Sequence, residues 1–172
     1  MTQLSLDGCT GIVLSPDNEP DRDTWCTPRW IAEAVGEWDL DPCSNSRSHI
    51  RAAQSCNLMR GEDGLAFAAD VGPGARVWIN PPYSAGQVIR WIRAYRHTRF
   101  CFLVRLDPST EWFAELYAAS SLILVPAGRR VDFDPPPGVK ASINPFPHAM
   151  FYASREDATE QIRALCFAWS CR

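Results

Sequence analysis

The sequence lacks the features of a membrane protein and of a disulfide-stabilised secreted protein. It has no run of about eighteen apolar residues, and residues 1–7 lack the basic and then apolar pattern of a signal peptide. Its seven cysteines are an odd number at irregular spacing, and no Cys-x-x-Cys pair occurs, which favours reduced thiols. We therefore expect a cytoplasmic protein with no membrane association.

The sequence also offers no metal site and little net charge. Cys26, Cys43, His49 and Cys56 have separations that fit no compact set of zinc ligands. A net charge of −3 argues against a protein that coats nucleic acid nonspecifically, although it is compatible with a locally basic cleft. Lys140 is the single lysine among 17 basic residues. The others are arginine, which is the better residue for planar phosphate and base contacts.

The length and composition predict one globular domain. With 172 residues, of which 46% are apolar, the chain can bury a substantial core. Residues 1–23 are polar, carry turn formers and show no sustained period, so we expect a flexible N-terminal arm. No repeat or linker divides residues 24–172, which are expected to form a single domain.

The most informative stretch is Val77–Ser84, with the sequence VWINPPYS. Apolar residues run directly into Pro81 and Pro82, which remove ladder donors and fix the backbone. The pattern predicts a buried strand that stops in a rigid loop. This loop would present the Asn80 amide, the Pro81 carbonyl and the Tyr83 ring to one small space. That set suits a flat ring bearing an amino group; an ordinary strand-terminating turn is the alternative.

Strands alternate with helices along the chain, which predicts an α/β sandwich with a mostly parallel sheet. Strands are expected at 38–44, 77–79, 100–104, 122–125 and 149–153, and helices at 28–35, 85–97, 109–119 and 154–169. The two late strands should form an antiparallel edge hairpin. Thr27 is expected to cap the first helix with Pro28 in its first position, and Ser154 to cap the last helix. The segment 52–58 suits a short helix or a strand.

Five short motifs follow one another along the chain. They are Trp-x-Thr-Pro at Trp25–Pro28, Asp-Leu-Asp-Pro-Cys at Asp39–Cys43, Asp-Gly-Leu at Asp63–Leu65, Trp-Ile-Asn-Pro-Pro-Tyr-Ser at Trp78–Ser84, and Trp-Phe at Trp112–Phe113. Over Trp25 to Ser154 this order resembles the phage-type DNA N-6-adenine methyltransferases, which depend on S-adenosylmethionine. The resemblance implies a Rossmann-like class I methyltransferase fold. One departure is that residues 41–46 contain none of the glycines that usually let backbone approach the cofactor.

The resemblance also implies roles for individual residues. The catalytic set would be Asn80, Pro81, Pro82 and Tyr83, with the Asn80 oxygen and the Pro81 carbonyl accepting the adenine N–H groups. Tyr83 would stack on an adenine flipped out of the duplex. The expected cofactor-binding residues are Trp25, Thr27, Pro28, Asp41, Pro42, Cys43, Ser44, Asp63 and Asn80. The expected DNA-binding residues are Tyr83, Ser84, Arg129, Arg130 and Lys140, and Asn144 and His148 are further candidates for phosphate or base contacts. For the residues from Arg129 onward, solvated loop charges are the alternative.

Individual residues can also be matched to parts of the cofactor and to the protein surface. Asp41 and Thr27–Pro28 are expected at the amino-acid end of S-adenosylmethionine, and Asp63 at its adenine amino group. Arginines 90, 93, 96 and 99 are expected to form an exposed helix face.

Alternative functions remain open from the sequence alone. Asn-Pro-Pro-Tyr also serves methyltransferases that act on RNA bases or on protein glutamine. A noncatalytic protein that binds DNA or a host factor on the same fold is a third reading. The DNA target site and the oligomeric state are not given by the sequence.

Overall fold

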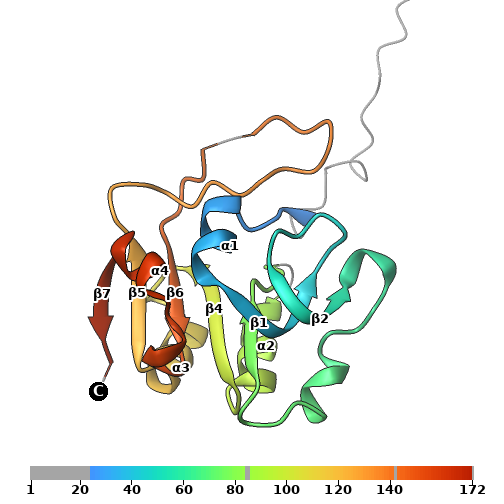
Figure 1. The fold of residues 1–172 in the computed structure, drawn as a ribbon, viewed down its shortest axis with the longest axis horizontal. Coiled ribbons are helices and arrows are strands. Elements are labelled where there is room, and N and C mark those ends of the chain that lie inside the picture. Colours follow the sequence, from blue (N-terminus) through green and yellow to red (C-terminus); the bar gives the residue numbers. More distant parts are fainter. Residues whose placement is uncertain (1–23, 84–85, 142, 172) are drawn as a thin grey trace, which may run out of the picture.

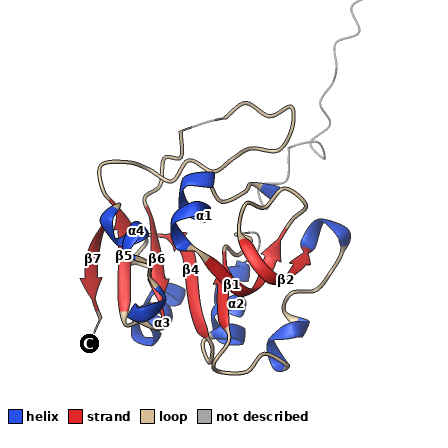
Figure 2. Cartoon of the chain, viewed as in Figure 1, coloured by secondary structure: helices blue, strands red, loops and turns tan. Residues whose placement is uncertain are grey.

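The computed structural model describes residues 24–83, 86–141 and 143–171, which build one seven-stranded sheet with helices on both faces (Figures 1 and 2). The strands are β1 (Glu37–Ser44), β2 (Arg51–Asn57), β3 (Arg76–Ile79), β4 (Arg99–Arg105), β5 (Leu122–Pro126), β6 (His148–Tyr152) and β7 (Cys166–Ser170). The expected arm, residues 1–23, lies outside the described residues, as does Ser84. No helix in the described ranges is long and apolar enough to cross a membrane.

The sheet order is β2-β1-β3-β4-β6-β5-β7. Strands β1 to β4 pair in parallel, while β6 lies antiparallel between β4 and β5. Strands β1 to β5 therefore point the same way and β6 and β7 the opposite way, so the sheet is mostly parallel, as predicted. This arrangement is consistent with a Rossmann-like fold.

Two apolar cores cover the two faces of the sheet. The helices are α1 (Arg29–Val35), α2 (Gln87–Tyr95), α3 (Glu111–Ala119) and α4 (Glu160–Ala164), with 3-10 turns η3 (Leu58–Arg60), η4 (Ala66–Ala69) and η6 (Arg155–Asp157). Because side chains alternate along a strand, Val77 and Ile79 pack on the α2 and α3 side, whereas Trp78 packs on the α1 and α4 side. The short strand β3 is thus buried on both faces, as its unbroken apolar sequence predicted.

The start of the first helix differs from the prediction. Helix α1 begins at Arg29, and Pro28 occupies the cap position, where its carbonyl accepts the N–H groups of Ile31 at 3.0 Å and Ala32 at 3.2 Å. Thr27 makes no capping hydrogen bond to the helix. Its hydroxyl instead contacts the side chain of Asn80, so the residue belongs to the pocket rather than to the helix end.

The last predicted helix, 154–169, is wrong. Ser154 caps only the turn η6, and Thr159 caps the short helix α4, its hydroxyl accepting the Ile162 N–H at 3.1 Å. Residues 166–170 form β7, which pairs with all of β5. The alternating sequence Cys-Phe-Ala-Trp-Ser suits a strand, and the ladder to β5 outweighs a continued helix.

Other predictions were partly right. The antiparallel pairing of β5 with β6 is confirmed, but β6 is internal and β7 forms the edge. The segment 52–58, for which the sequence allowed a short helix or a strand, lies mostly in strand β2. Arg99 is not on a helix face, because it begins β4 and, together with Arg76, pairs with the buried carboxylate of Asp157.

A close backbone contact fixes the turn before η4 against the end of β1. A Cβ added at Gly64 would lie 2.0 Å from the Pro42 carbonyl oxygen and 2.8 Å from the Trp91 ring. The Tyr95 hydroxyl donates to the Gly64 carbonyl at 2.5 Å. The absence of a side chain at Gly64 therefore lets this turn pack directly on the backbone at the end of β1.

The Gly64→Ala substitution tests this contact. The added methyl collides with backbone rather than with a flexible side chain, so we expect the free energy of unfolding to fall by about 1–3 kcal/mol. Gly72→Ala is the matched control, because a Cβ there meets nothing within 4 Å. Urea denaturation of both variants measures the effect. Equal midpoints would contradict the contact.

Candidate active site

The site lies where the carboxyl ends of β1 and β3 meet. From β1 the chain continues to β2 on one side, while β3 pairs with the other side of β1, which makes this point the topological switch of the sheet. Ligands of open α/β sheets bind in the crevice outside such a point. A small cleft there is lined by Trp25, Cys26, Thr27, Asp41, Cys43, Asn45, Ser48, Trp78 and Asn80. A wider hollow beside α1, lined by residues such as Arg29 and Glu33, contains none of the predicted site residues.

Asp41 brings a buried carboxyl group to the cleft, with only 3% of its surface exposed. Its Oδ1 accepts the Cys43 N–H at 3.1 Å, and its Oδ2 accepts the Ser48 hydroxyl at 3.4 Å. Burial raises the pKa of Asp41 to about 7, against these hydrogen bonds, which lower it. Within the described residues no cation pairs with this carboxyl, so a cationic ligand would stabilise its ionised form.

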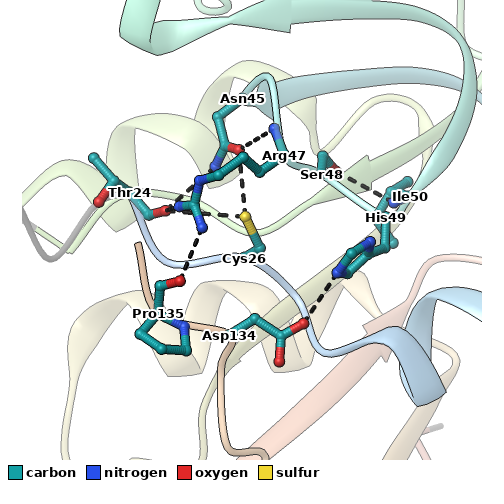
Figure 3. Close-up of polar contacts among 9 residues, drawn as sticks. All are labelled: Thr24, Cys26, Asn45, Arg47, Ser48, His49, Ile50, Asp134 and Pro135. Atoms are coloured by element: carbon teal, nitrogen blue, oxygen red, sulfur yellow. Dashed lines mark hydrogen bonds and ion pairs between the residues drawn. The ribbon is translucent and has the colours of Figure 1, made fainter. Parts of the chain in front are cut away.

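Three segments that are far apart in the sequence meet beside the cleft (Figure 3). Cys26 and Asp134 exchange backbone hydrogen bonds of 3.0 and 2.9 Å. The Arg47 guanidinium donates to the Pro135 carbonyl at 2.9 Å and also to the Thr24 carbonyl. Segment 24–27 is therefore held between the loop after β1 and the long loop between β5 and β6.

Side chains in the loop after β1 complete this network (Figure 3). The Asn45 oxygen accepts the Arg47 N–H at 2.9 Å and the Cys26 thiol at 3.3 Å. His49 Nε2 lies 3.1 Å from Asp134 Oδ2. The long loop 127–147 is thereby fastened to the residues that line the cleft.

The predicted catalytic loop follows β3 directly. The Asn80 side-chain nitrogen donates to the Thr27 hydroxyl at 3.5 Å, a long contact that turns this end of the amide toward segment 24–27. Within the described ranges the Asn80 side-chain oxygen has no hydrogen-bond donor. Pro81 is buried and Asn80 is half-buried, so the amide stands at the cleft wall on a rigid support.

Tyr83 is fixed by contacts with the end of β4. Its hydroxyl oxygen accepts the Arg105 backbone N–H at 2.8 Å, and its ring meets the His148 ring edge-on at 6.4 Å. Burial raises the pKa of the Tyr83 phenol, although the contacts with Arg105 lower it. The phenol stays protonated at neutral pH, so it is suited to packing and not to proton abstraction.

The structure brings some of the predicted cofactor residues together and separates others. Those that line the cleft are Trp25, Thr27, Asp41, Cys43 and Asn80. Pro28 is the cap residue of α1, Pro42 packs against Gly64, and Ser44 is buried at the end of β1. Asp63 does not line the cleft; its Oδ1 accepts the N–H groups of Leu65 at 2.9 Å and Ala66 at 3.3 Å, which caps a turn.

The predicted DNA-binding arginines already contact the protein. The Arg129 guanidinium lies over the Trp30 ring at 4.0 Å, and Arg130 donates to the Pro145 carbonyl at 2.9 Å. Lys140 is exposed in the same loop. These contacts leave guanidinium edges for phosphate, but they also show that both arginines shape the loop.

Sequence reasoning missed several residues around the cleft: Cys26, Asn45, Arg47, Ser48, Trp78, Asp134 and Arg105. The polar sequence of residues 44–48 offers hydroxyl groups and backbone amides to a ligand, which could have suggested Asn45 and Ser48. Asp134 had no such signal, because its role depends on pairing with a segment more than one hundred residues earlier. No group of three or more His, Cys, Asp or Glu residues in the described part of the chain could hold a metal ion.

Comparison with known proteins gives a consistent result. The family model described as DNA N-6-adenine-methyltransferase (Dam) matches residues 15–159. The DNA N-6-adenine-methyltransferase of Escherichia phage T1 is 28% identical over 127 residues, which cover 68% of this chain and 51% of that protein. The chain thus spans about half the length of this curated relative. No solved structure matches. Because the family model spans most of the sequence, the chain belongs to the DNA N-6-adenine-methyltransferase (Dam) family.

Proposed function

We propose that the chain transfers a methyl group from S-adenosylmethionine to the exocyclic amino nitrogen of adenine in DNA. The observation that carries this proposal is the meeting of Asp41 and Asn80 in one cleft at the switch point of the sheet. Family membership supports the substrate and the usual methyl donor. The residues of the cleft supply the chemistry that such a reaction needs.

The residues that line the cleft suit the cofactor in charge. The buried Asp41 carboxyl has no cation partner in the described part of the chain, and it suits the ammonium of an amino-acid group. Trp25 and Trp78 add aromatic surface to the same walls. When bound, S-adenosylmethionine supplies an electrophilic methyl group on its sulfonium sulfur. Asp63 lies outside the cleft, yet its turn is pressed on β1 through Gly64, so it remains a candidate for the adenine end.

Asn80 and Pro81 act on the adenine amino group. That nitrogen is a weak nucleophile, because its lone pair is conjugated into the ring. If the Asn80 oxygen and the Pro81 carbonyl each accept one N–H, the lone pair is localised on the face toward the cofactor, and positioning supplies much of the rate. No strong base is required, which agrees with the protonated state of Tyr83.

Two alternatives share the same site. A methyltransferase acting on RNA bases or protein glutamine would use the same acceptors, and the family match favours DNA over both. A noncatalytic DNA-binding protein on the same fold is the second alternative. Binding of S-adenosylmethionine, measured by calorimetry, separates it from the enzyme readings, since a protein that only binds DNA does not need the cofactor.

Asn80→Ala tests the catalytic role. The variant loses one acceptor for the amino group, so the rate of methyl transfer to adenine-containing DNA should fall by about 100-fold or more. Transfer of a radiolabelled methyl group measures the rate. Gln161→Ala, on the exposed surface of α4, is the control and should match the wild type. An undiminished rate in Asn80→Ala would refute the assignment.

Tyr83 is tested by two replacements. Phenylalanine keeps the ring and its stacking but removes the acceptor of the Arg105 N–H, so stability should drop by about 1 kcal/mol while the transfer rate stays within a few-fold. Alanine removes the ring, and loss of about 1–3 kcal/mol of base stacking should slow the reaction by roughly five- to a hundredfold. Thermal melts and transfer rates report the two effects. Equal rates for both variants would rule out stacking.

The raised pKa of Asp41 predicts a pH dependence of binding. A cationic ligand favours the ionised carboxyl, so the affinity for S-adenosylmethionine should rise as the pH increases through about 7. Calorimetry at pH 6, 7 and 8 measures this slope. Asp41→Asn should bind more weakly and with a flatter profile. An affinity independent of pH in the wild type would contradict the role of Asp41.

The same shift predicts the opposite trend for the free protein. In the unfolded chain Asp41 ionises near its ordinary pKa of 3.8, whereas in the fold it ionises near 7. Its contribution to stability is therefore full at low pH and is lost as the pH rises from about 4 to 7. Asp41→Asn should remove this part of the pH dependence of stability. The unfolding free energies of the wild type and the variant are measured at pH 5 and at pH 8, and the difference between the two proteins should change between these pH values. A constant difference would contradict the shift.

A further inference from the structure

A second group of residues beside the catalytic loop is not explained by the chemistry above. The guanidinium of Arg105, the last residue of β4, lies 4.9 Å from the centroid of the Tyr83 ring and 4.1 Å from that of Phe146. In the part of the chain that the structure describes, its N–H groups have no hydrogen-bond acceptor and no carboxylate partner. A half-buried cation thus lies over two aromatic rings and has no anionic partner among the described residues.

The ring of Phe146 is held in place although 46% of the residue is exposed. Its N–H donates to the Asn144 side-chain oxygen at 3.1 Å, and its carbonyl lies 3.1 Å from His148 Nδ1, which must carry the proton because a carbonyl only accepts. Burial lowers the pKa of His148 to about 4, with Arg105 and Arg130 adding to the effect, so the imidazole is neutral. Two residues, Asn144 and His148, therefore hold the backbone of Phe146, whose exposed ring lies over Arg105.

The location ties this arrangement to the catalytic loop. Strand β4 pairs with β3, and Asn80 directly follows β3, so the ends of both strands lie at the same edge of the sheet. The Arg105 backbone N–H also holds the Tyr83 hydroxyl. Any shift of Arg105 would therefore move the ring that is expected to stack on adenine.

The two cation–π contacts do not use the hydrogen-bond donors of the guanidinium. Its central carbon lies over both rings, and its N–H groups have no acceptor among the described residues, so they can donate to a ligand. Planar edge donors match the oxygens of a phosphate, and the base and phosphate of one extruded nucleotide are only a few bonds apart. From this geometry we infer that Arg105 binds a DNA backbone phosphate next to the flipped adenine, with Phe146 and Tyr83 fixing its plane. This inference rests on the proposed function and extends it to the DNA strand.

The salt dependence of DNA binding tests this inference. Arg105→Met keeps an unbranched side chain and removes the charge, so the slope of log K against log salt for an adenine-containing duplex should become shallower by about 0.9, the value for one lost phosphate contact. Arg90→Met, on the exposed face of α2, is the matched control and should keep the wild-type slope. Fluorescence anisotropy with the full chain supplies the data. Affinity for S-adenosylmethionine should be unchanged in both variants.

The Arg105→Lys variant tests whether the change in slope comes from the lost charge and not from misfolding of Arg105→Met. It keeps the charge but not the planar donors, so it should restore the salt slope while binding DNA more weakly than the wild type. An unchanged slope in Arg105→Met would overturn the inference. So would a loss of cofactor affinity, because the guanidinium would then serve the cofactor. Methyl transfer by the wild-type protein is measured separately, and its absence would refute the proposed function. If the wild type transfers methyl groups but Arg105→Met keeps the wild-type salt slope, only the phosphate contact is refuted.

Discussion

The pairing of β1 with β3 in the middle of the sheet is the constraint on which the site depends. Because these strands are parallel neighbours and the chain leaves them toward opposite sides, Asp41 and Asn80 reach the same cleft from segments about forty residues apart. The two groups need different surroundings. Asp41 is buried and has no cation partner among the described residues, which favours a cationic ligand, while Asn80 precedes the buried Pro81. One strand pairing thus brings a buried carboxyl group and a side-chain amide to the same cleft.

The long loop between β5 and β6 connects this cleft to the rest of the surface. At Asp134 and Pro135 it is hydrogen-bonded to segment 24–27 and to Arg47, and near Phe146 it covers Arg105. The same loop carries the basic residues that were expected to meet DNA. This loop therefore contacts both segment 24–27, which lines the cleft, and Arg105 at the end of β4.

Local patterns were sufficient for the buried strands β1, β3, β4, β5 and β6, and insufficient for the edge strand β7 and for contacts between distant segments. The apolar residues before Asn80 predicted β3 correctly, because burial on both faces leaves a clear sequence signature. The last helix was wrong, because β7 forms only through its ladder with β5. Thr27 was assigned to a helix cap, but its hydroxyl contacts Asn80 across 53 residues of sequence. Arg47 and Asp134 could not be found from sequence, since each acts through a partner 85 or more residues away.

The central claim is that this cleft methylates the amino nitrogen of adenine in DNA. The most direct test is to incubate the purified chain with S-adenosylmethionine and unmethylated duplex DNA, digest the DNA to nucleosides and identify the products by mass spectrometry. The account predicts N6-methyladenine as the new nucleoside, formed only when the cofactor is present. A methyl group on another base, or none on DNA from a protein that is folded and binds the cofactor, would contradict it.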